Sequence, residues 1–295
     1  MKILLTGKNG QVGFELQRSL APLGSVYAVD SGDCDLANAD ALRALIRDVR
    51  PQLIVNPAAY TSVDRAETEV AKAMAVNTVA PGIMGEEADR LGASVIHFST
   101  DYVFDGRKPT PYTEQDPTGP LGVYGQSKLD GEKALASATS RHLILRTSWV
   151  VGAHGHNFAK TMLRLAAERK QLNVVSDQLG APTSAALLAD LSAHLVRRLQ
   201  TDGAGSYPFG TYHLSASGET SWHAYARHVI ARALQAGQPL QLTPDNIRAI
   251  ATDDYPTAAR RPQNSRLDTS QFQATFGLRL PPWQHGLDHI LQQIL

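Results

Sequence analysis

Residues 1–20 read MKILLTGKNGQVGFELQRSL, and this stretch indicates the fold. Residues 2–6 form a short apolar run typical of a buried strand. Residues 12–20 carry apolar side chains every fourth residue, a spacing that keeps one face of a helix against a sheet. Three glycines separate the two segments in the pattern GxxGxxG: Gly7, Gly10 and Gly13. The chain therefore begins with a strand, a glycine-rich turn and a helix.

The same alternation of strand and helix continues to about residue 147. Further strands are predicted at residues 25–30, 53–56, 95–100 and 143–147, and helices near residues 42–49, 79–91 and 124–138. Parallel strands need a crossover connection, and the crossover is usually helical. The sequence therefore predicts an α/β fold, a Rossmann-type doubly wound parallel sheet with helices on both faces.

After about residue 148 the pattern changes and helices dominate. They are predicted at residues 157–168, 184–199 and 221–234, with a last one from residue 283. We expect residues 1–150 to form a dinucleotide-binding Rossmann domain. Residues 151–295 are expected to form a smaller, mainly helical substrate-binding region, some segments of which pack back on the first domain.

Composition argues against several classes of partner. The 295 residues carry 28 basic and 28 acidic side chains, so the basic surplus that binding to a phosphate backbone requires is missing. No stretch approaches the roughly 18 consecutive apolar residues of a membrane helix. The single cysteine, Cys34, cannot form an internal disulfide. We expect a cytoplasmic protein that binds neither nucleic acid nor membrane.

The glycine-rich turn favours a dinucleotide cofactor. The first glycine permits the tight turn, the second lets the main chain approach a diphosphate, and the third allows close packing of the helix. The helix N-terminus adds unpaired amides and a partial positive charge. The residues expected to bind the cofactor here are Gly7, Asn9, Gly10, Gln11, Val12 and Gly13. Asp30, at the end of the second strand, is a candidate ligand of the adenosine ribose; alternatively it only forms the turn before Ser31 and Gly32.

A second pattern indicates proton-transfer chemistry. Tyr124 and Lys128 are four residues apart at the start of a predicted helix, so that both side chains share one face. A phenol is a reluctant acid at neutral pH, and a neighbouring ammonium would lower its pKa. Thr100 ends the fourth strand, at the edge of the sheet where ligands bind in such folds, and could hold a carbonyl oxygen there.

With these residues in place, the sequence resembles the extended short-chain dehydrogenase/reductases, and within them the enzymes that reduce dTDP-4-keto-6-deoxy sugars. The resemblance covers nearly the whole chain. Eight blocks follow one another in the family's order: residues 7–16 (GKNGQVGFEL), 56–64 (NPAAYTSVD), 99–104 (STDYVF), 123–128 (VYGQSK), 146–149 (RTSW), 157–162 (NFAKTM), 177–183 (DQLGAPT) and 261–267 (RPQNSRL).

The resemblance implies a reaction and a set of site residues. NADPH or NADH would reduce C4 of dTDP-4-dehydro-6-deoxy-L-mannose, a nucleotide sugar, to give dTDP-L-rhamnose. Tyr124 would supply the proton, Lys128 would bind the nicotinamide ribose, and Thr100 would orient the carbonyl. Further cofactor-binding positions are Ala58, Ala59, Tyr60 and Asn77. Substrate-binding positions are Thr61, Val63, Thr100, Asp101, Tyr102 and Trp149, the last of which could equally belong to the core.

The resemblance also raises the question of a metal. The best-known bacterial members place Mg²⁺ at a dimer interface, held by a glutamate of the first helix and two further acids. Glu15 matches the first position, but Ala186 and Gln293 occupy the other two and offer no carboxylate. We therefore expect no Mg²⁺ site, whereas a homodimer formed through helices stays open. His154 and His156 lack a third partner at useful spacing and are expected to form a polar loop.

Two other functions share much of this pattern. A nucleotide-sugar epimerase uses the same glycine turn and Tyr–Lys pair but retains its NAD without net redox change. A non-catalytic regulatory subunit, of the kind that accompanies methionine adenosyltransferase, resembles the same family. Thr100, Tyr124 and Lys128 occur together here, which favours catalysis, because a protein that only binds has no chemical need of a poised phenol.

Overall fold

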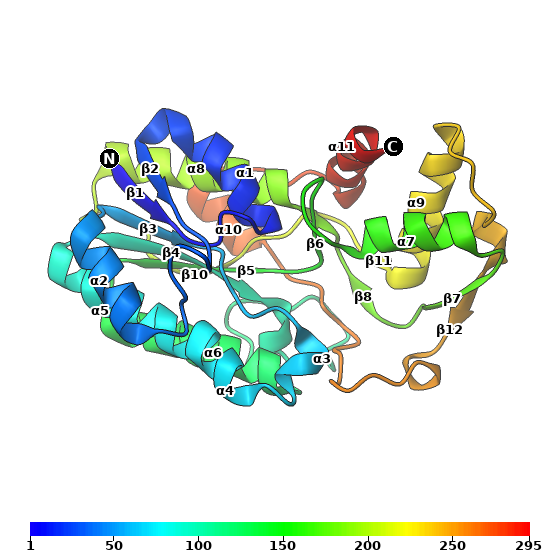
Figure 1. Cartoon of the computed structure of the whole chain (residues 1–295), viewed down its shortest axis with the longest axis horizontal. Coiled ribbons are helices and arrows are strands. Elements are labelled where there is room, and N and C mark those ends of the chain that lie inside the picture. Colours follow the sequence, from blue (N-terminus) through cyan, green and yellow to red (C-terminus); the bar gives the residue numbers. More distant parts are fainter.

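Six parallel strands form the central sheet of the computed structural model, which describes residues 1–295 (Figure 1). Their order across the sheet is β10-β5-β4-β3-β1-β2, and every neighbouring pair is parallel. The strands are β1 (Lys2–Leu5), β2 (Ser25–Ala28), β3 (Leu53–Asn56), β4 (Ser94–Thr100), β5 (His142–Thr147) and β10 (Gly210–His213). The predicted doubly wound α/β fold is confirmed.

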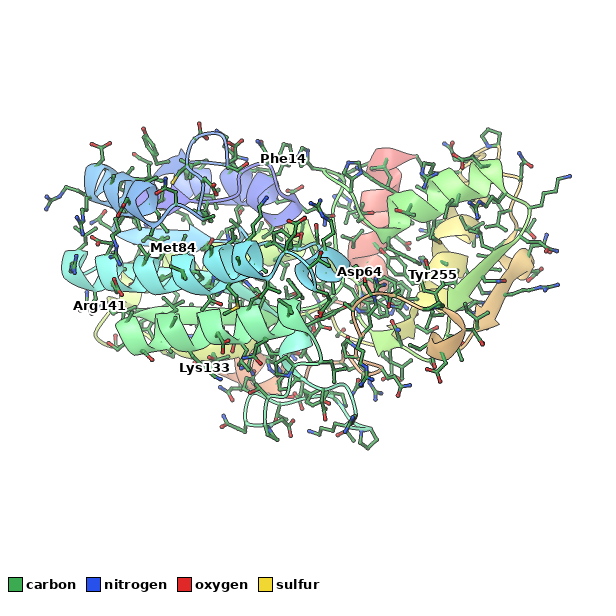
Figure 2. The ribbon with its side chains drawn as sticks, turned by 60° about the horizontal axis from the view of Figure 1, so that its bottom comes forward. Phe14, Asp64, Met84, Lys133, Arg141 and Tyr255 are labelled. Atoms are coloured by element: carbon green, nitrogen blue, oxygen red, sulfur yellow. The ribbon has the colours of Figure 1, made fainter.

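Helices cover both faces of this sheet (Figure 1). On one face lie α1 (Gln11–Leu20), α8 (Ala185–Asp202) and α10 (Ser270–Phe276), which share a buried apolar cluster with the strands. On the other face lie α2 (Ala39–Val49), α5 (Ala80–Leu91) and α6 (Val123–Ala138). Figure 2 shows α5 and α6 side by side, with Met84 and Lys133 on them.

The edge strand β10 comes from the second half of the chain. No strand is expected from the sequence at residues 210–213, yet these residues pair in register with Leu143–Arg146 of β5. Helices α8 and α10 also follow residue 150 and pack on the sheet, so the second half contributes a strand and two helices to the Rossmann unit.

A second lobe holds three further helices (Figure 1). Its core is a buried cluster formed by α7 (Phe158–Glu168), α9 (Trp222–Gln235) and α11 (Trp283–Ile294). Three short strand pairs accompany them: β7 (Leu172–Val175) with β12 (Ile247–Ile250), β8 (Leu179–Gly180) with β11 (Thr220–Ser221), and β6 (Val150–Val151) with β9 (Thr183–Ser184).

Short helical segments make up the rest of the regular structure. They are α3 (Val63–Ala66), α4 (Val70–Met74), a π-helical segment (Ala75–Val79) and 3₁₀ turns at Ala21–Leu23, Asp101–Val103, Pro244–Asn246 and Thr252–Asp254. None of the helices combines the length and the hydropathy that crossing a membrane would require.

Candidate active site

A cleft of about 870 Å³ lies at the carboxyl ends of the strands, and residues of both lobes line it. The carboxyl edge of a doubly wound sheet is where such folds bind ligands. All but one of the residues predicted for the site line this cleft: Gly7, Asn9, Gly10, Gln11, Val12, Gly13, Asp30, Ala58, Ala59, Tyr60, Thr61, Val63, Thr100, Asp101, Tyr102, Tyr124, Lys128 and Trp149. The exception is Asn77.

The glycine-rich turn forms a cradle at the start of α1. Gly7 has φ +64°, a conformation that favours glycine, and a Cβ on Gly13 would lie 2.0 Å from the Gly7 carbonyl oxygen. At Gly10 a Cβ would meet only that same oxygen, at 3.3 Å, so a larger side chain there would extend into the cleft. No side chain caps α1, which leaves the first amides of the helix for a ligand. The cradle fits the diphosphate of a dinucleotide.

Asp30 lines the cleft and also forms the turn that follows β2. One carboxylate oxygen accepts a hydrogen bond from the Gly32 amide at 2.8 Å, and the other accepts from the Asn9 side chain. Next to it, Lys8 pairs with Asp33 at 2.5 Å. Both interpretations of Asp30 therefore agree with the structure, because a turn-forming carboxylate at this position still faces the cleft.

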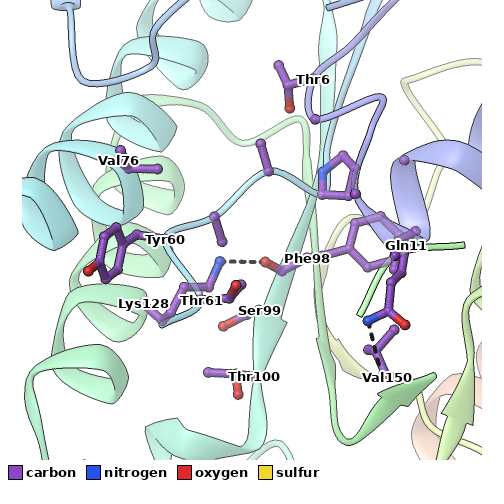
Figure 3. A pocket seen from close by; sticks show the side chains of 18 of the residues that line it. Thr6, Gln11, Tyr60, Thr61, Val76, Phe98, Ser99, Thr100, Lys128 and Val150 are labelled. Carbon is purple, nitrogen blue, oxygen red and sulfur yellow. Dashed lines mark hydrogen bonds between the residues drawn. The ribbon is translucent and has the colours of Figure 1, made fainter. Parts of the chain in front are cut away.

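The second lobe contacts the glycine-rich turn directly. The Gln11 side chain donates to the Val150 carbonyl at 3.4 Å, and Figure 3 shows it reaching toward that strand. The Asn157 side chain donates to the side-chain Oε1 of Gln11 at 3.0 Å, and His154 Nε2 lies 3.0 Å from the main-chain carbonyl of Asn9. These contacts fix the cradle relative to the second lobe.

Thr100, Tyr124 and Lys128 meet at the inner part of the cleft. Thr100 is the last residue of β4, and its hydroxyl donates to Asp101 at 3.0 Å. Tyr124 and Lys128 lie in the first two turns of α6 and line the same cavity. In Figure 3 the Lys128 side chain points toward β4, where Ser99 and Thr100 follow Phe98.

The Lys128 ammonium is held by groups of β4. It donates to the Phe98 carbonyl at 2.6 Å and lies 3.2 Å from the Nε2 atom of His97. The side chain is buried, with 1% of the residue exposed. Burial lowers the pKa of Lys128 to about 8, and the charge of Glu132 opposes that decrease.

The expected effect of Lys128 on the acidity of Tyr124 is wrong for this structure. Burial raises the pKa of Tyr124 to about 12; the charge of Asp101 adds to the increase, and a hydrogen bond with Thr100 opposes it. The physical reason is that the ammonium is directed at Phe98 and His97, so it does not offset the cost of burying a phenolate.

Asp101 is a buried carboxyl beside this group. It is 3% exposed, and one of its oxygens has no hydrogen-bond partner. Burial raises the pKa of Asp101 to about 6, against the opposing hydrogen bonds of Ser265 and Thr100. A carboxyl with such a pKa exchanges its proton near neutral pH, so the cleft holds a second group that can donate or accept one.

Asn77, predicted to bind the cofactor, does not line the cleft. It lies in the π-helical segment and is buried behind Tyr60, whose main-chain amide and carbonyl it binds. Its amide nitrogen also donates to Ser127 at 3.0 Å. The structure turns the Asn77 side chain into the protein, where it supports the Tyr60 loop that lines the cleft.

Trp149 both lines the cleft and packs against the second lobe. Its φ of +48° is rare for a residue other than glycine, and its ring stacks on Trp222 at 3.7 Å between centroids. Gly180 makes room for the ring, since a Cβ there would lie 2.5 Å from it. Strained main chain of this kind is often found at ligand sites.

The cleft has further lining residues to which the sequence analysis assigns no role. They are Thr6, Val29, Ser31, Cys34, Asp35, Leu36, Pro57, Lys72, Val76, Phe98, Ser99, Thr147, Ser148, Val150, Gly155, His156 and Trp222. Those at strand ends, such as Ser99 and Thr147, could have been found from the rule that the carboxyl ends of parallel strands meet at one edge. Nothing in the sequence points to Gly155, His156 or Trp222, which reach the cleft only through the placement of the second lobe.

The structure gathers no three potential metal-ligating side chains at one place. Glu15 accepts a hydrogen bond from Arg18 at 3.3 Å, and Arg18 also pairs with Asp190 at 2.9 Å. The carboxylate that matches the family's metal ligand is thus engaged by an arginine.

Comparison with known proteins agrees with this geometry. The sequence matches the family described as RmlD substrate binding domain over residues 1–295. It is 50% identical to the dTDP-4-dehydrorhamnose reductase of Escherichia coli strain K12, covering 100% of this chain and 98% of that protein. It is 45% identical to the enzyme of the same name from Burkholderia thailandensis, covering 100% and 99%.

A solved structure gives the same result. The fold matches the crystal structure of dTDP-4-dehydrorhamnose reductase from Bacillus anthracis in complex with NADP, with a TM-score of 0.89, 32% identity and 99% of each chain covered. The Clostridium acetobutylicum counterpart gives a TM-score of 0.88 with 33% identity, again over 99% of each chain. The chain belongs to the RmlD substrate binding domain family, together with these dTDP-4-dehydrorhamnose reductases.

Proposed function

We propose that this chain is an NAD(P)H-dependent oxidoreductase that reduces the C4 keto group of dTDP-4-dehydro-6-deoxy-L-mannose to give dTDP-L-rhamnose. The observation that carries the proposal is the meeting of Thr100, Tyr124 and Lys128 in one cleft that continues to the glycine-rich cradle. Relatives that share 45–50% of its residues over their whole length carry this activity in their names.

Different residues of the cleft bind different parts of the cofactor. The cradle of α1 binds the diphosphate through main-chain amides, and Asp30 accepts hydrogen bonds from the adenosine ribose. The nicotinamide, when bound, supplies the hydride. Lys128 binds the nicotinamide ribose.

Around the sugar, Thr100 donates a hydrogen bond to the carbonyl oxygen and Tyr124 transfers its proton to that oxygen as negative charge develops. A raised pKa keeps Tyr124 protonated at neutral pH, which is the state that a proton donor needs. Thr61, Val63, Asp101, Tyr102 and Trp149 surround the sugar and hold it against this pair.

We also propose how the chain is organised for this task. Residues 1–150 bind the dinucleotide, and residues 151–295 close the cleft over the nucleotide sugar while returning β10, α8 and α10 to the sheet. The enzyme works in the cytoplasm, binds no nucleic acid and forms a homodimer through its helices without bridging Mg²⁺. Sedimentation equilibrium with and without EDTA tests the last point.

A spectrophotometric assay tests the reaction. The purified protein is mixed with dTDP-4-keto-6-deoxy-L-mannose and either NADPH or NADH, and absorbance at 340 nm is followed. We expect oxidation of cofactor in a 1:1 ratio to the dTDP-L-rhamnose formed. Protein that carries bound NAD and interconverts sugars without net oxidation would instead be an epimerase, and absence of any turnover with a stoichiometric protein partner would favour the regulatory function.

A further inference from the structure

A buried histidine lies directly behind the lysine of the site. His97 precedes Phe98 in β4, is 0% exposed and does not line the cleft. Its Nε2 atom is 3.2 Å from the Lys128 ammonium, and its Nδ1 atom is 3.0 Å from the side-chain amide of Asn56. Asn56 in turn bonds to the Thr6 hydroxyl at 2.6 Å. A chain of polar side chains thus runs from Thr6, directly after β1, through β3 and β4 to α6, inside the core.

The chemistry of an ammonium group fixes the role of the imidazole. An ammonium has three donors and no acceptor, so the ring atom beside it must present a lone pair. Nε2 is therefore the acceptor, and the proton of the neutral ring is on Nδ1. With the proton on Nδ1, the Asn56 side chain must turn its oxygen to Nδ1 and its nitrogen to the Thr6 hydroxyl, which is the arrangement here with the two amide atoms exchanged. The main chain of Asn56 also bonds to the imidazole.

The surroundings keep the imidazole neutral. Burial lowers the pKa of His97 well below its ordinary value, and the positive charge of Lys128 acts in the same direction. The other titratable group whose charge acts on Lys128 is Glu132. Glu132 accepts from Arg146 and Ser99, so that its charge is already paired. His97 is the side chain that supplies Lys128 with an uncharged acceptor.

We infer that His97 is a positioning residue: its Nε2 atom accepts a hydrogen bond from the Lys128 ammonium, keeps that group charged and holds it in the cleft. The Phe98 carbonyl provides the second acceptor at 2.6 Å, so one ammonium N–H is left for a ligand. The inference rests on the proposed function only in so far as Lys128 serves the reaction. The pairing itself can be tested without cofactor or sugar.

The first experiment uses the ligand-free protein. NMR of ¹⁵N-labelled histidine rings distinguishes a protonated nitrogen from one with a lone pair, and the His97→Gln spectrum identifies which of the 10 histidines is His97. We expect the Nδ1–H form, unchanged from pH 5 to 9. A proton on Nε2, or a ring that becomes charged in this range, would overturn the inference.

The second experiment uses the pH dependence of turnover. In His97→Leu the ammonium loses an acceptor, and a hydrogen bond to a charged group shifts a pKa by about one to two units. The loss of activity at alkaline pH should therefore occur at least about one pH unit lower, with turnover at pH 8 reduced at least about fivefold and the KM for sugar little changed. His97→Gln, whose amide oxygen can accept, should recover part of the shift.

His213→Leu is the matched control, because His213 is also fully buried in a strand of the sheet but does not line the cleft or contact Lys128. His213→Leu should lower the thermal stability and leave the pH dependence of turnover unchanged. An alkaline limb of His97→Leu that coincides with that of the unaltered protein contradicts the inference. If His97→Leu fails to fold, the tautomer of His97 in the unaltered protein and the pH dependence of turnover of His97→Gln still test the inference. If the unaltered protein reduces no ketosugar, the proposed function fails while the tautomer measurement decides the pairing separately.

Discussion

The side chain of Asn77 binds both main-chain groups of Tyr60: it accepts from the amide at 2.8 Å and donates to the carbonyl at 3.1 Å. The same amide donates to Ser127, whose hydroxyl binds the Tyr124 carbonyl at 2.8 Å. One buried side chain therefore connects the loop after β3 with the helix that carries Tyr124 and Lys128. The π-helical segment that holds Asn77 is a form often found at functional sites.

Asn77→Ala should weaken cofactor binding, although Asn77 itself does not line the cleft. The substitution leaves buried main-chain groups of Tyr60 unpaired, at a cost of about 1–3 kcal/mol in the free energy of unfolding, and frees the loop that lines the cleft. We expect a higher Kd for NADPH, measured by calorimetry, and a lower midpoint in urea. Tyr207→Phe, which removes a buried hydrogen bond to the Leu195 carbonyl at a position that does not line the cleft, should lower stability by about 1 kcal/mol and leave the Kd unchanged.

Tyr124→Phe should reduce turnover by about two to four orders of magnitude, the usual contribution of a positioned proton donor. Cofactor affinity should stay near that of the unaltered enzyme, because the ring that lines the cleft is retained. Steady-state assay and cofactor titration measure the two effects. Tyr225→Phe is the control, since this buried hydroxyl of the second lobe has no hydrogen-bond partner. Full activity of Tyr124→Phe would show that another group donates the proton.

Gly10→Val should raise the Kd for the dinucleotide at least tenfold, which corresponds to about 1.4 kcal/mol. The reason is that the side chain would extend into the space the diphosphate needs, while little protein stands in its way. Fluorescence titration with NADPH measures the change. Gly205→Val, at a position with nothing within 4 Å, should leave affinity as it was. An unchanged Kd for Gly10→Val would show that the glycine-rich cradle does not bind the cofactor.

Asp101 should make the protein less stable as the pH rises from about 4 to about 6. In this window the unfolded chain has released the proton of Asp101, whereas the folded protein retains it because its pKa is raised to about 6. The two-unit difference corresponds to about 3 kcal/mol lost across the window. Asp101→Asn should lack this slope in urea unfolding at pH 4.5, 5.5 and 6.5, whereas Asp48→Asn, at an exposed position, should keep it. Parallel curves for the unaltered protein and Asp101→Asn would show that burial does not hold the proton.

Strands β1, β3, β4 and β5 could be predicted because each is a short, mostly buried run, as in β4, where all seven residues are buried. β2 has no buried residue and was predictable only from its place in the alternation of strands and helices. β10 could not be predicted, since Gly210–His213 (GTYH) is not an apolar run and half of it is partly exposed. Nothing in residues 75–79 marks a π-helical turn, so the inward direction of Asn77 was out of reach.

The candidate site was predictable where a spacing fixes a geometry. Tyr124 and Lys128 share one face because helix periodicity requires it, and the glycines of the first turn follow from the close approach of main chain to main chain. The partner of the ammonium was not predictable. His97 lies one residue before Phe98 and two before Ser99, but only the packing of α6 on β4 brings its ring to Lys128.

The strand order has a consequence for how the polypeptide matures on the ribosome. β10, the outer neighbour of β5, and α10, the last helix packed on the sheet, are translated long after the glycine-rich cradle has emerged. Until then the nascent chain presents an open strand edge and bare apolar surface, the combination that promotes association between chains. A product terminated near residue 150 should therefore aggregate, and the ability to hold a dinucleotide should be acquired only as synthesis nears completion.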